Sequence, residues 1–197
     1  MADQNFHNFH VQLSNSDCEF YGTLRLRIVT HHEESRRSVF AKVLAYCLEY
    51  SDDLRVATAP YETHAPALSA VDGTGGYLRW IDVGEVRAEK LSRALRHHRG
   101  AQFAVYFYEH AQAVRFADDL RGSTENWIEP VQFYLIDPQF VELIPEGDGK
   151  RVVWEVAIVD RGIYLTTGDA QCSGQAQPLD MWGIYQQALL PPSIKYS

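Results

Sequence analysis

The sequence predicts a single α/β domain with a central mixed β-sheet flanked by helices. Helical and strand periodicities alternate through the middle of the chain, and patterns typical of antiparallel hairpins lie at both ends. The chain has 197 residues, of which 46% are hydrophobic, and this is enough to bury one substantial core. We place the domain at residues 8–169 and expect residues 170–197 to form a weakly ordered C-terminal tail.

A half-buried hairpin is predicted at the start of the chain. Residues 9–13 and 20–29 alternate apolar and polar side chains on either side of a turn at 14–17. In the second of these strands the apolar side chains point one way and the arginines the other. The hairpin is therefore expected to have one buried face and one solvated face.

The first helix is expected to follow this hairpin. Thr30 and Glu33 have the spacing of a capping box, with Thr30 as the N-cap. Apolar residues recur at helical spacing between residues 40 and 47, so one face of the helix is expected to pack inward. The turn residues that follow Tyr50 are expected to end the helix.

Strands and helices then alternate up to residue 143. Strands are expected at residues 54–58, 65–69, 77–83, 103–108 and 131–136, with a glycine-rich turn at 72–76. Helices are expected at residues 87–98 and 113–120, with a short helical turn at 138–143. The segment 103–108 is apolar at nearly every position, which is typical of a strand buried on both faces. A final hairpin is expected at residues 152–159 and 163–167.

The predicted core combines the inward faces of these helices and strands. Its members are Leu24, Leu26, Ile28, Phe40, Val43, Leu44, Leu78, Trp80, Leu91, Leu95, Val105, Phe107, Phe116, Leu120, Phe133, Leu135, Val156 and Ile163. If Trp80 or Phe107 were exposed, our assignment of the strand's side chains to the buried face would be wrong there.

Charge and cysteine content limit the function classes. A net charge of −8 argues against a dedicated sequence-independent nucleic-acid binder, although it leaves room for a local basic groove. The three cysteines are scattered and form no CxxC pair, and Cys47 lies in an apolar helical pattern. We therefore expect free thiols and a cytoplasmic location. The N-terminus has no secretory pattern and no apolar run is long enough to span a membrane, so no membrane association is expected.

The segment 77–95 carries the most specific chemical pattern. An apolar strand ends in Asp82, Gly84 follows, and a helix bearing Lys90 and Arg93 begins. A carboxylate at a strand end facing cations on the next helix is the layout that metal-dependent phosphodiester chemistry uses.

The chain resembles the YaeQ family of bacterial proteins over residues 8–170. The resemblance rests on His31–Ser35 at the first helix, on Leu44–Tyr46, on Pro66, and on the Trp-Ile-Asp-Val-Gly segment at Trp80–Gly84. It implies a variant of the PD-(D/E)xK nuclease-like (restriction-endonuclease-like) fold, in agreement with the order of helices and strands predicted from the patterns.

The resemblance also implies a site. In such a nuclease core, Glu34 and Asp82 would hold Mg²⁺ or Mn²⁺, and Lys90 would act as the catalytic cation. The site is depleted, because Ala67 stands where the family fold has a second metal-binding acid and Gly84 stands where it has the lysine.

Each of these residues also has a purely structural interpretation. Asp82 is equally suited to capping the next helix or favouring its dipole, and Glu34 to favouring the dipole of the first helix. Lys90 in such a position is more often a solvated residue of a helix face. His98 is more readily explained as a cover for the edge of the core than as a metal ligand.

We therefore favour a non-catalytic binding or regulatory module, with a Mg/Mn-dependent nuclease acting on nucleic-acid phosphodiesters as the alternative. The partner is not identified by the sequence, and both a nucleic acid and a protein are compatible with it. Arg87, Lys90 and Arg93 recur at three-residue spacing and are expected to form the main positive patch, beside a cleft between the two helices. Pairing of these cations with Glu85 and Glu89 is the alternative.

Overall fold

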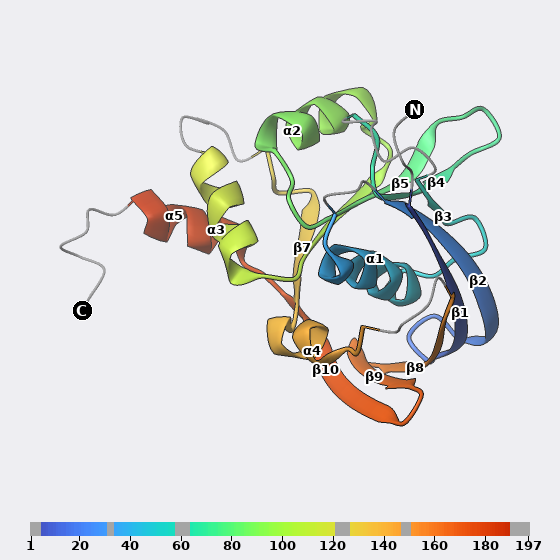
Figure 1. The fold of residues 1–197 in the computed structure, drawn as a ribbon. Coiled ribbons are helices and arrows are strands. Elements are labelled where there is room, and N and C mark those ends of the chain that lie inside the picture. The colour runs from blue at the N-terminus through green and yellow to red at the C-terminus, as the bar shows by residue number, and fades with distance from the viewer. Residues whose placement is uncertain (1–4, 31–33, 58–63, 121–126, 147–150, 190–197) are drawn as a thin grey trace.

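A single strongly curved sheet surrounds one helix in the computed structural model, which describes residues 5–30, 34–57, 64–120, 127–146 and 151–189 (Figure 1). The strands of the described chain are β1 Asn5–Asn15, β2 Phe20–Thr30, β3 Arg55–Val56, β4 Leu68–Val71, β5 Tyr77–Val83, β6 Gln102–Phe107, β7 Val131–Ile136, β8 Arg151–Val159, β9 Gly162–Thr167 and β10 Ala170–Pro178. They form one sheet in the order β2-β1-β8-β9-β10-β7-β6-β5-β4-β3. The two edge strands β2 and β3 contact each other, so the sheet nearly closes.

The helices of the described chain lie on both faces of this sheet. They are α1 Arg36–Leu48, α2 Ala88–His97, α3 His110–Asp119, α4 Pro138–Leu143 and α5 Met181–Leu189. Helix α1 lies in the concave side, whereas α2, α3 and α5 lie outside it (Figure 1). No described helix has both the length and the apolar character that crossing a membrane requires.

The N-terminal hairpin has the predicted buried and solvated faces. Strands β1 and β2 pair antiparallel, and the apolar side chains of β2 at Leu24, Leu26 and Ile28 are buried while Arg25 and Arg27 are exposed. Strand β1 also pairs in parallel with β8, which joins the N-terminal hairpin to the strands after residue 150 in one sheet. The alternation of apolar and polar residues predicted which face of the hairpin is buried. The pairing of β1 with β8 is seen only in the tertiary structure.

Strands β5, β6 and β7 are parallel neighbours and divide the core in two. Alternate side chains of β6 enter different clusters: Ala104 and Tyr106 pack on the α1 side, whereas Val105 and Phe107 pack on the α2 and α3 side. This confirms that the segment is buried on both faces. Successive side chains point to opposite faces of a strand. Each side chain of β5 therefore also packs on only one face of the sheet.

The segment after residue 169 differs from the predicted weakly ordered tail. Strand β10 pairs with β9 on one side and with β7 on the other, so it joins the two halves of the sheet. Gly174 allows β10 to take this position in the sheet, since a Cβ on residue 174 would lie only 2.4 Å from the Cβ of the buried Phe140. Helix α5 packs against α3 and buries Tyr185. Residues 190–197 lie outside the described residues.

The start of α1 and two positions of the core list are corrected by the structure. Thr30 is the last residue of β2, and the N-cap is Ser35, whose side chain accepts a hydrogen bond from the Ser38 amide. The proposed capping partner Glu33 lies outside the described residues. Leu78 is 46% exposed and Leu95 is partly buried, whereas Trp80, Phe107 and the other members of the core list are buried.

The three cysteines are expected to differ in reactivity toward iodoacetamide. Burial raises the pKa of the Cys47 thiol to about 12 and raises the pKa of Cys172, whereas Cys18 is exposed. The thiolate is the reactive form, and a raised pKa lowers its fraction at every pH below that pKa. We expect mass spectrometry to show alkylation of Cys18 first and of Cys47 only after unfolding. Equal rates at Cys18 and Cys47 in native buffer would contradict this packing.

Candidate functional site

Asp82 is a buried carboxylate whose two oxygens both have partners within the protein. Its side chain is only 3% exposed. The Lys90 ammonium donates to Oδ1 at 2.6 Å, and the indole Nε1 of Trp80 donates to Oδ2 at 3.0 Å. The Lys90 side chain also lies over the Trp80 ring, 5.9 Å from its centroid. The structure therefore brings Asp82 and Lys90 together as an ion pair beneath α2.

Glu34 has a similar partner, but on a different helix. It precedes α1, and its Oε1 accepts hydrogen bonds from the Ser38 hydroxyl at 2.6 Å and from the Lys42 ammonium. Both charged side chains are mostly buried. Glu34 is thus held at the start of α1 by two residues of that helix.

The structure does not bring Glu34 and Asp82 together. In β5, Ile81 and Val83 pack on the α1 side, whereas Trp80 packs on the α2 side. Asp82 lies between Ile81 and Val83 and contacts Trp80 and Lys90, so it faces α2. Helix α1 covers the opposite face, so the sheet lies between α1 and α2 where the cleft was expected. Among the described residues, no group of three or more His, Cys, Asp or Glu side chains is placed to hold a metal ion.

These donors do not fit a shared Mg²⁺ or Mn²⁺ ion. A hard cation of this kind needs several oxygen ligands that converge on it, at about 2.0–2.1 Å for Mg²⁺. At Asp82 a lysine nitrogen already occupies the position at which an ion would approach Oδ1. At Glu34 the accepting oxygen is likewise occupied by Lys42.

The exposed side of α2 carries two adjoining hollows. The ring hollow has a volume of about 390 Å³ and is lined by the aromatic residues Trp80, His97 and His98 and by Lys90, Arg93 and Ala94. The cation hollow has a volume of about 80 Å³ and is lined by Arg87, Glu89, Lys90 and Arg93. His64 borders both hollows. The predicted row of Arg87, Lys90 and Arg93 is therefore found on one surface.

The structure also decides among the alternatives for these charges. Arg93 pairs with Glu89 at 2.8 Å, an exposed pair four residues apart on the helix. Glu85 pairs instead with Arg115 of α3. His98 covers the edge of the core, where its ring stacks on Trp80. An exposed ion pair of this kind contributes little free energy. A ligand can therefore compete with Glu89 for Arg93.

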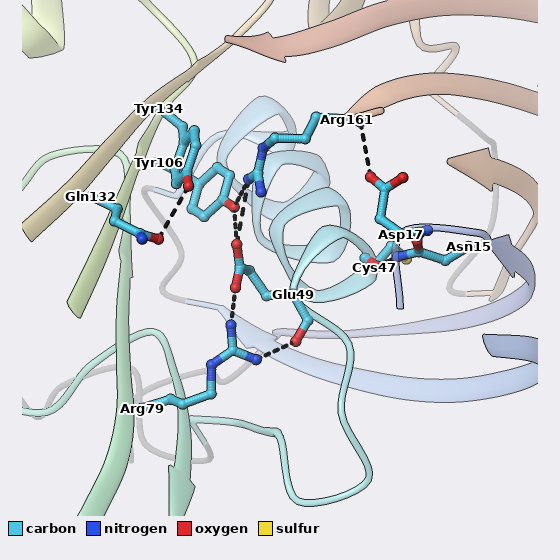
Figure 2. A network of polar contacts seen from close by, with 9 residues as sticks. All are labelled: Asn15, Asp17, Cys47, Glu49, Arg79, Tyr106, Gln132, Tyr134 and Arg161. Carbon is cyan, nitrogen blue, oxygen red and sulfur yellow. Dashed lines mark hydrogen bonds and ion pairs between the residues drawn. The ribbon is translucent and has the colours of Figure 1, made fainter. Parts of the chain in front are cut away.

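A second polar cluster, which we did not predict, lies at the C-terminal end of α1 (Figure 2). The Glu49 carboxylate is 9% exposed and pairs with the guanidinium groups of Arg79 and Arg161. The Tyr106 hydroxyl donates to Glu49, and Arg161 donates to the same hydroxyl. Arg161 also lies over the Tyr134 ring, 3.8 Å from its centroid. We call Glu49, Arg79, Tyr106 and Arg161 the Glu49 network.

The backbone of the β8–β9 turn positions Arg161 for this contact. Asp160 and Arg161 both have positive φ, 48° and 59°, as a tight two-residue hairpin turn requires. The Asp17 carboxylate accepts hydrogen bonds from the amides of Asp160 and Arg161 at 2.8 and 2.9 Å and so supports this conformation. Figure 2 shows the contact with Arg161. The turn after β1 therefore fixes the place of Arg161.

Burial shifts the pKa values of two members of this cluster. It raises the pKa of Tyr106, with the Arg161 charge acting in the opposite direction. Burial also lowers the pKa of the Arg79 guanidinium, and the nearby Tyr106 opposes this effect. Tyr106 is accordingly a neutral hydroxyl near neutral pH, able to donate to Glu49.

Two sequence signals point to the Glu49 network. Tyr106 lies in a strand predicted to be buried on both faces, where its hydroxyl needs a hydrogen-bond partner. Arg79 interrupts an apolar strand between Leu78 and Trp80. Neither signal identifies Glu49 as the partner, because it is 30 residues from Arg79 and 57 from Tyr106.

Two crystal structures share this fold. The YaeQ protein from Pseudomonas syringae superposes with a TM-score of 0.74 and 19% identity, covering 89% of this chain and 96% of that one. The YaeQ protein from Xanthomonas axonopodis pv. citri superposes with a TM-score of 0.76 and 17% identity, covering 90% and 98%. No curated protein matches the chain significantly.

A family model confirms the resemblance noted from the sequence. The model described as YaeQ protein matches residues 1–176, which includes both β5 with Asp82 and most of β10. This is well over half of the chain, and the fold of the two solved relatives agrees with it. The chain belongs to the YaeQ family.

Proposed function

We propose that this protein is a non-catalytic binding module that takes phosphate-bearing ligands on the α2 surface, defined by Arg87, Lys90 and Arg93. One observation carries the proposal. Each carboxylate of the suspected metal site already has a lysine partner, and the two lie on opposite faces of the sheet. Arg87 and Arg93 are by contrast exposed at the hollows of α2.

The element order α1-β3-β4-β5-α2-β6 supports descent from a nuclease-like core that has lost its chemistry. The β5 side chains that pack on the α1 side, Ile81 and Val83, are apolar. Hydrolysis in such a core needs a second metal-binding acid and a lysine, and Ala67 and Gly84 stand at those two positions. An order of elements alone does not specify a function, and these substitutions favour binding over hydrolysis. The free thiols are in keeping with a reducing, cytoplasmic setting.

The charge distribution also favours this surface. Residues 85–99 contain five Lys and Arg against two Glu, a net charge of +3 in a chain whose total is −8. An anionic ligand is repelled by most of the molecule and attracted to this segment. Such an arrangement directs a phosphate-bearing ligand to one surface, with a strong dependence on ionic strength.

The nuclease alternative predicts metal binding, and we expect none at these carboxylates. Calorimetry with Mn²⁺ should give no heat that depends on Asp82, because Lys90 and Trp80 already satisfy that carboxylate. Incubation with single- and double-stranded DNA and with RNA in Mg²⁺ or Mn²⁺ should leave the strands intact. Cleavage that the native protein performs and the Asp82→Ala variant does not would overturn the proposal.

The binding itself is tested with an abasic deoxyribose-phosphate oligomer, a probe that offers phosphates and no bases. We expect the double substitution Arg87→Glu with Arg93→Glu to weaken binding and to flatten its salt dependence. Each lost phosphate contact on a single strand should lower the slope of log K against log salt by about 0.7. Lys90 is left unchanged, since a carboxylate there would face the buried Asp82.

A matched control makes the charge change specific. Arg25→Glu with Arg27→Glu introduces the same total charge change on the exposed face of β2. We expect this variant to bind the abasic oligomer nearly as well as the native chain. If both double variants lose affinity equally, net charge explains the binding and the α2 surface does not.

A further inference from the structure

A stack of rings leads from the core to the α2 surface. Phe103 and Trp80 are almost fully buried and stack with their centroids 6.1 Å apart and their planes 30° apart. The half-buried ring of His98 follows, 5.6 Å from Trp80 and at 24° to it. The Tyr77 ring supports both from the edge, at 4.9 Å from Trp80 and 4.8 Å from His98. His98 is thus a fixed ring at the rim of the protein.

The stack ends at the ring hollow. His98 and the exposed His97 border this space, and their ring centroids lie 6.4 Å apart. The hollow measures about 390 Å³, and drug-sized ligands occupy pockets of roughly 300–1,000 Å³. A flat unsaturated ring fits such a place, because offset or parallel stacking on an aromatic ring is favourable.

The ring hollow and the cation hollow share Lys90 and Arg93. A ligand that fills both presents a planar ring on one side and an anion on the other. A nucleotide unit has this composition, with its base for the ring hollow and its phosphate for the cations. Proteins that bind unpaired bases combine aromatic platforms with positively charged grooves in the same way.

We propose that the α2 surface binds single-stranded nucleic acid, with an unpaired base stacked at His98 and the adjoining phosphate held by Arg87 and Arg93. This inference rests on the proposed function, because it names the ligand of the same surface. A base within a duplex is already stacked on both faces and cannot enter the ring hollow. Single strands are therefore bound in preference to duplexes of the same sequence.

A free nucleotide offers the same chemistry, so the experiment has four probes: a labelled single-stranded DNA oligomer, its duplex, the abasic oligomer of equal length, and a mononucleotide as competitor. Fluorescence anisotropy is measured at several salt concentrations. We expect the base-containing single strand to bind on the order of ten-fold more tightly than the abasic oligomer, because stacking of a base on an aromatic ring is favourable and the abasic oligomer has no base. Displacement of the strand by equimolar mononucleotide would identify the free nucleotide as the ligand and overturn the single-strand assignment.

Two substitutions of His98 separate stacking from folding. His98→Gln removes the ring, and we expect it to abolish the preference for the base-containing strand while leaving abasic binding unchanged. His98→Phe keeps a ring on Trp80 and should retain that preference. The thermal unfolding midpoint of each variant shows whether a loss of binding affinity comes from misfolding.

The outcomes distinguish this inference from the function on which it rests. Equal affinity for the base-containing and abasic oligomers overturns base stacking and leaves phosphate binding in place. Tighter binding of the duplex than of the single strand also overturns it. Absence of any effect of Arg87→Glu with Arg93→Glu on the abasic oligomer overturns the proposed function itself.

Discussion

Replacing Glu49 by alanine is expected to lower the free energy of unfolding by about 3 kcal/mol, because removing one partner of a buried ion pair leaves its counterpart uncompensated. Two guanidinium groups, those of Arg79 and Arg161, would then face each other without the carboxylate between them. We place the loss at the low end for buried pairs because these arginine side chains are 24% and 28% exposed. Urea unfolding near neutral pH measures it.

A graded series separates charge from shape at Glu49. Glu49→Gln keeps an oxygen that accepts from Tyr106 and removes the charge, so its cost should lie between those of the native chain and the alanine variant. Tyr106→Phe should cost less than Glu49→Ala, because it leaves the ion pairs with Arg79 and Arg161 in place. A loss below about 0.5 kcal/mol for Glu49→Ala, the usual size of a surface effect, would contradict the network.

Trp154→Ala should be the most damaging substitution in the core, at about 3–5 kcal/mol for a fully buried tryptophan. The Trp154 side chain is completely buried in β8. It contacts the rings of Phe9 from β1 and Phe40 from α1, with centroids 5.0 and 5.3 Å away. Its loss leaves a cavity between the sheet and the helix that the sheet surrounds. Trp182→Ala serves as the control because Trp182 is 36% exposed.

The conservative change at this site is expected to be mild. The indole Nε1 of Trp154 is buried and has no hydrogen-bond partner among the described residues. An unsatisfied buried donor costs about 1–3 kcal/mol, so Trp154→Phe loses packing and also removes this cost. We expect Trp154→Phe to destabilise by less than half as much as Trp154→Ala. Equal losses for the two variants would contradict this expectation.

Most strands and helices were predictable because local patterns determine them. The buried strand β6, the helix α2 and the alternation in β2 all follow from side-chain periodicity, which reflects the geometry of a single element. Strand β10 was missed for the same reason. Its residues are mainly small and polar, so its place depends on backbone pairing with β9 and β7 and on the close approach of Phe140 to Gly174. Whether such a segment forms a strand depends on the neighbouring strands and side chains that it packs against.

The candidate site was predictable only in part. The sequence pattern correctly put Arg87, Lys90 and Arg93 on one surface, since residues three apart share a helix face. It placed Asp82 near Lys90, as the structure does. It could not show that Glu34 is on the other side of the sheet, because the pattern of a strand does not say which helix covers which face.

The sequence by itself determined most of the helices and strands, most of the buried side chains, and that a cationic row follows Asp82. The tertiary structure alone decided which of these groups meet. Glu49 meets Arg161 across 112 residues of chain, and Asp82 meets Lys90 instead of Glu34. The physical reason is that local propensity acts within a few residues, whereas the pairing of buried charges depends on how the whole sheet curves around α1.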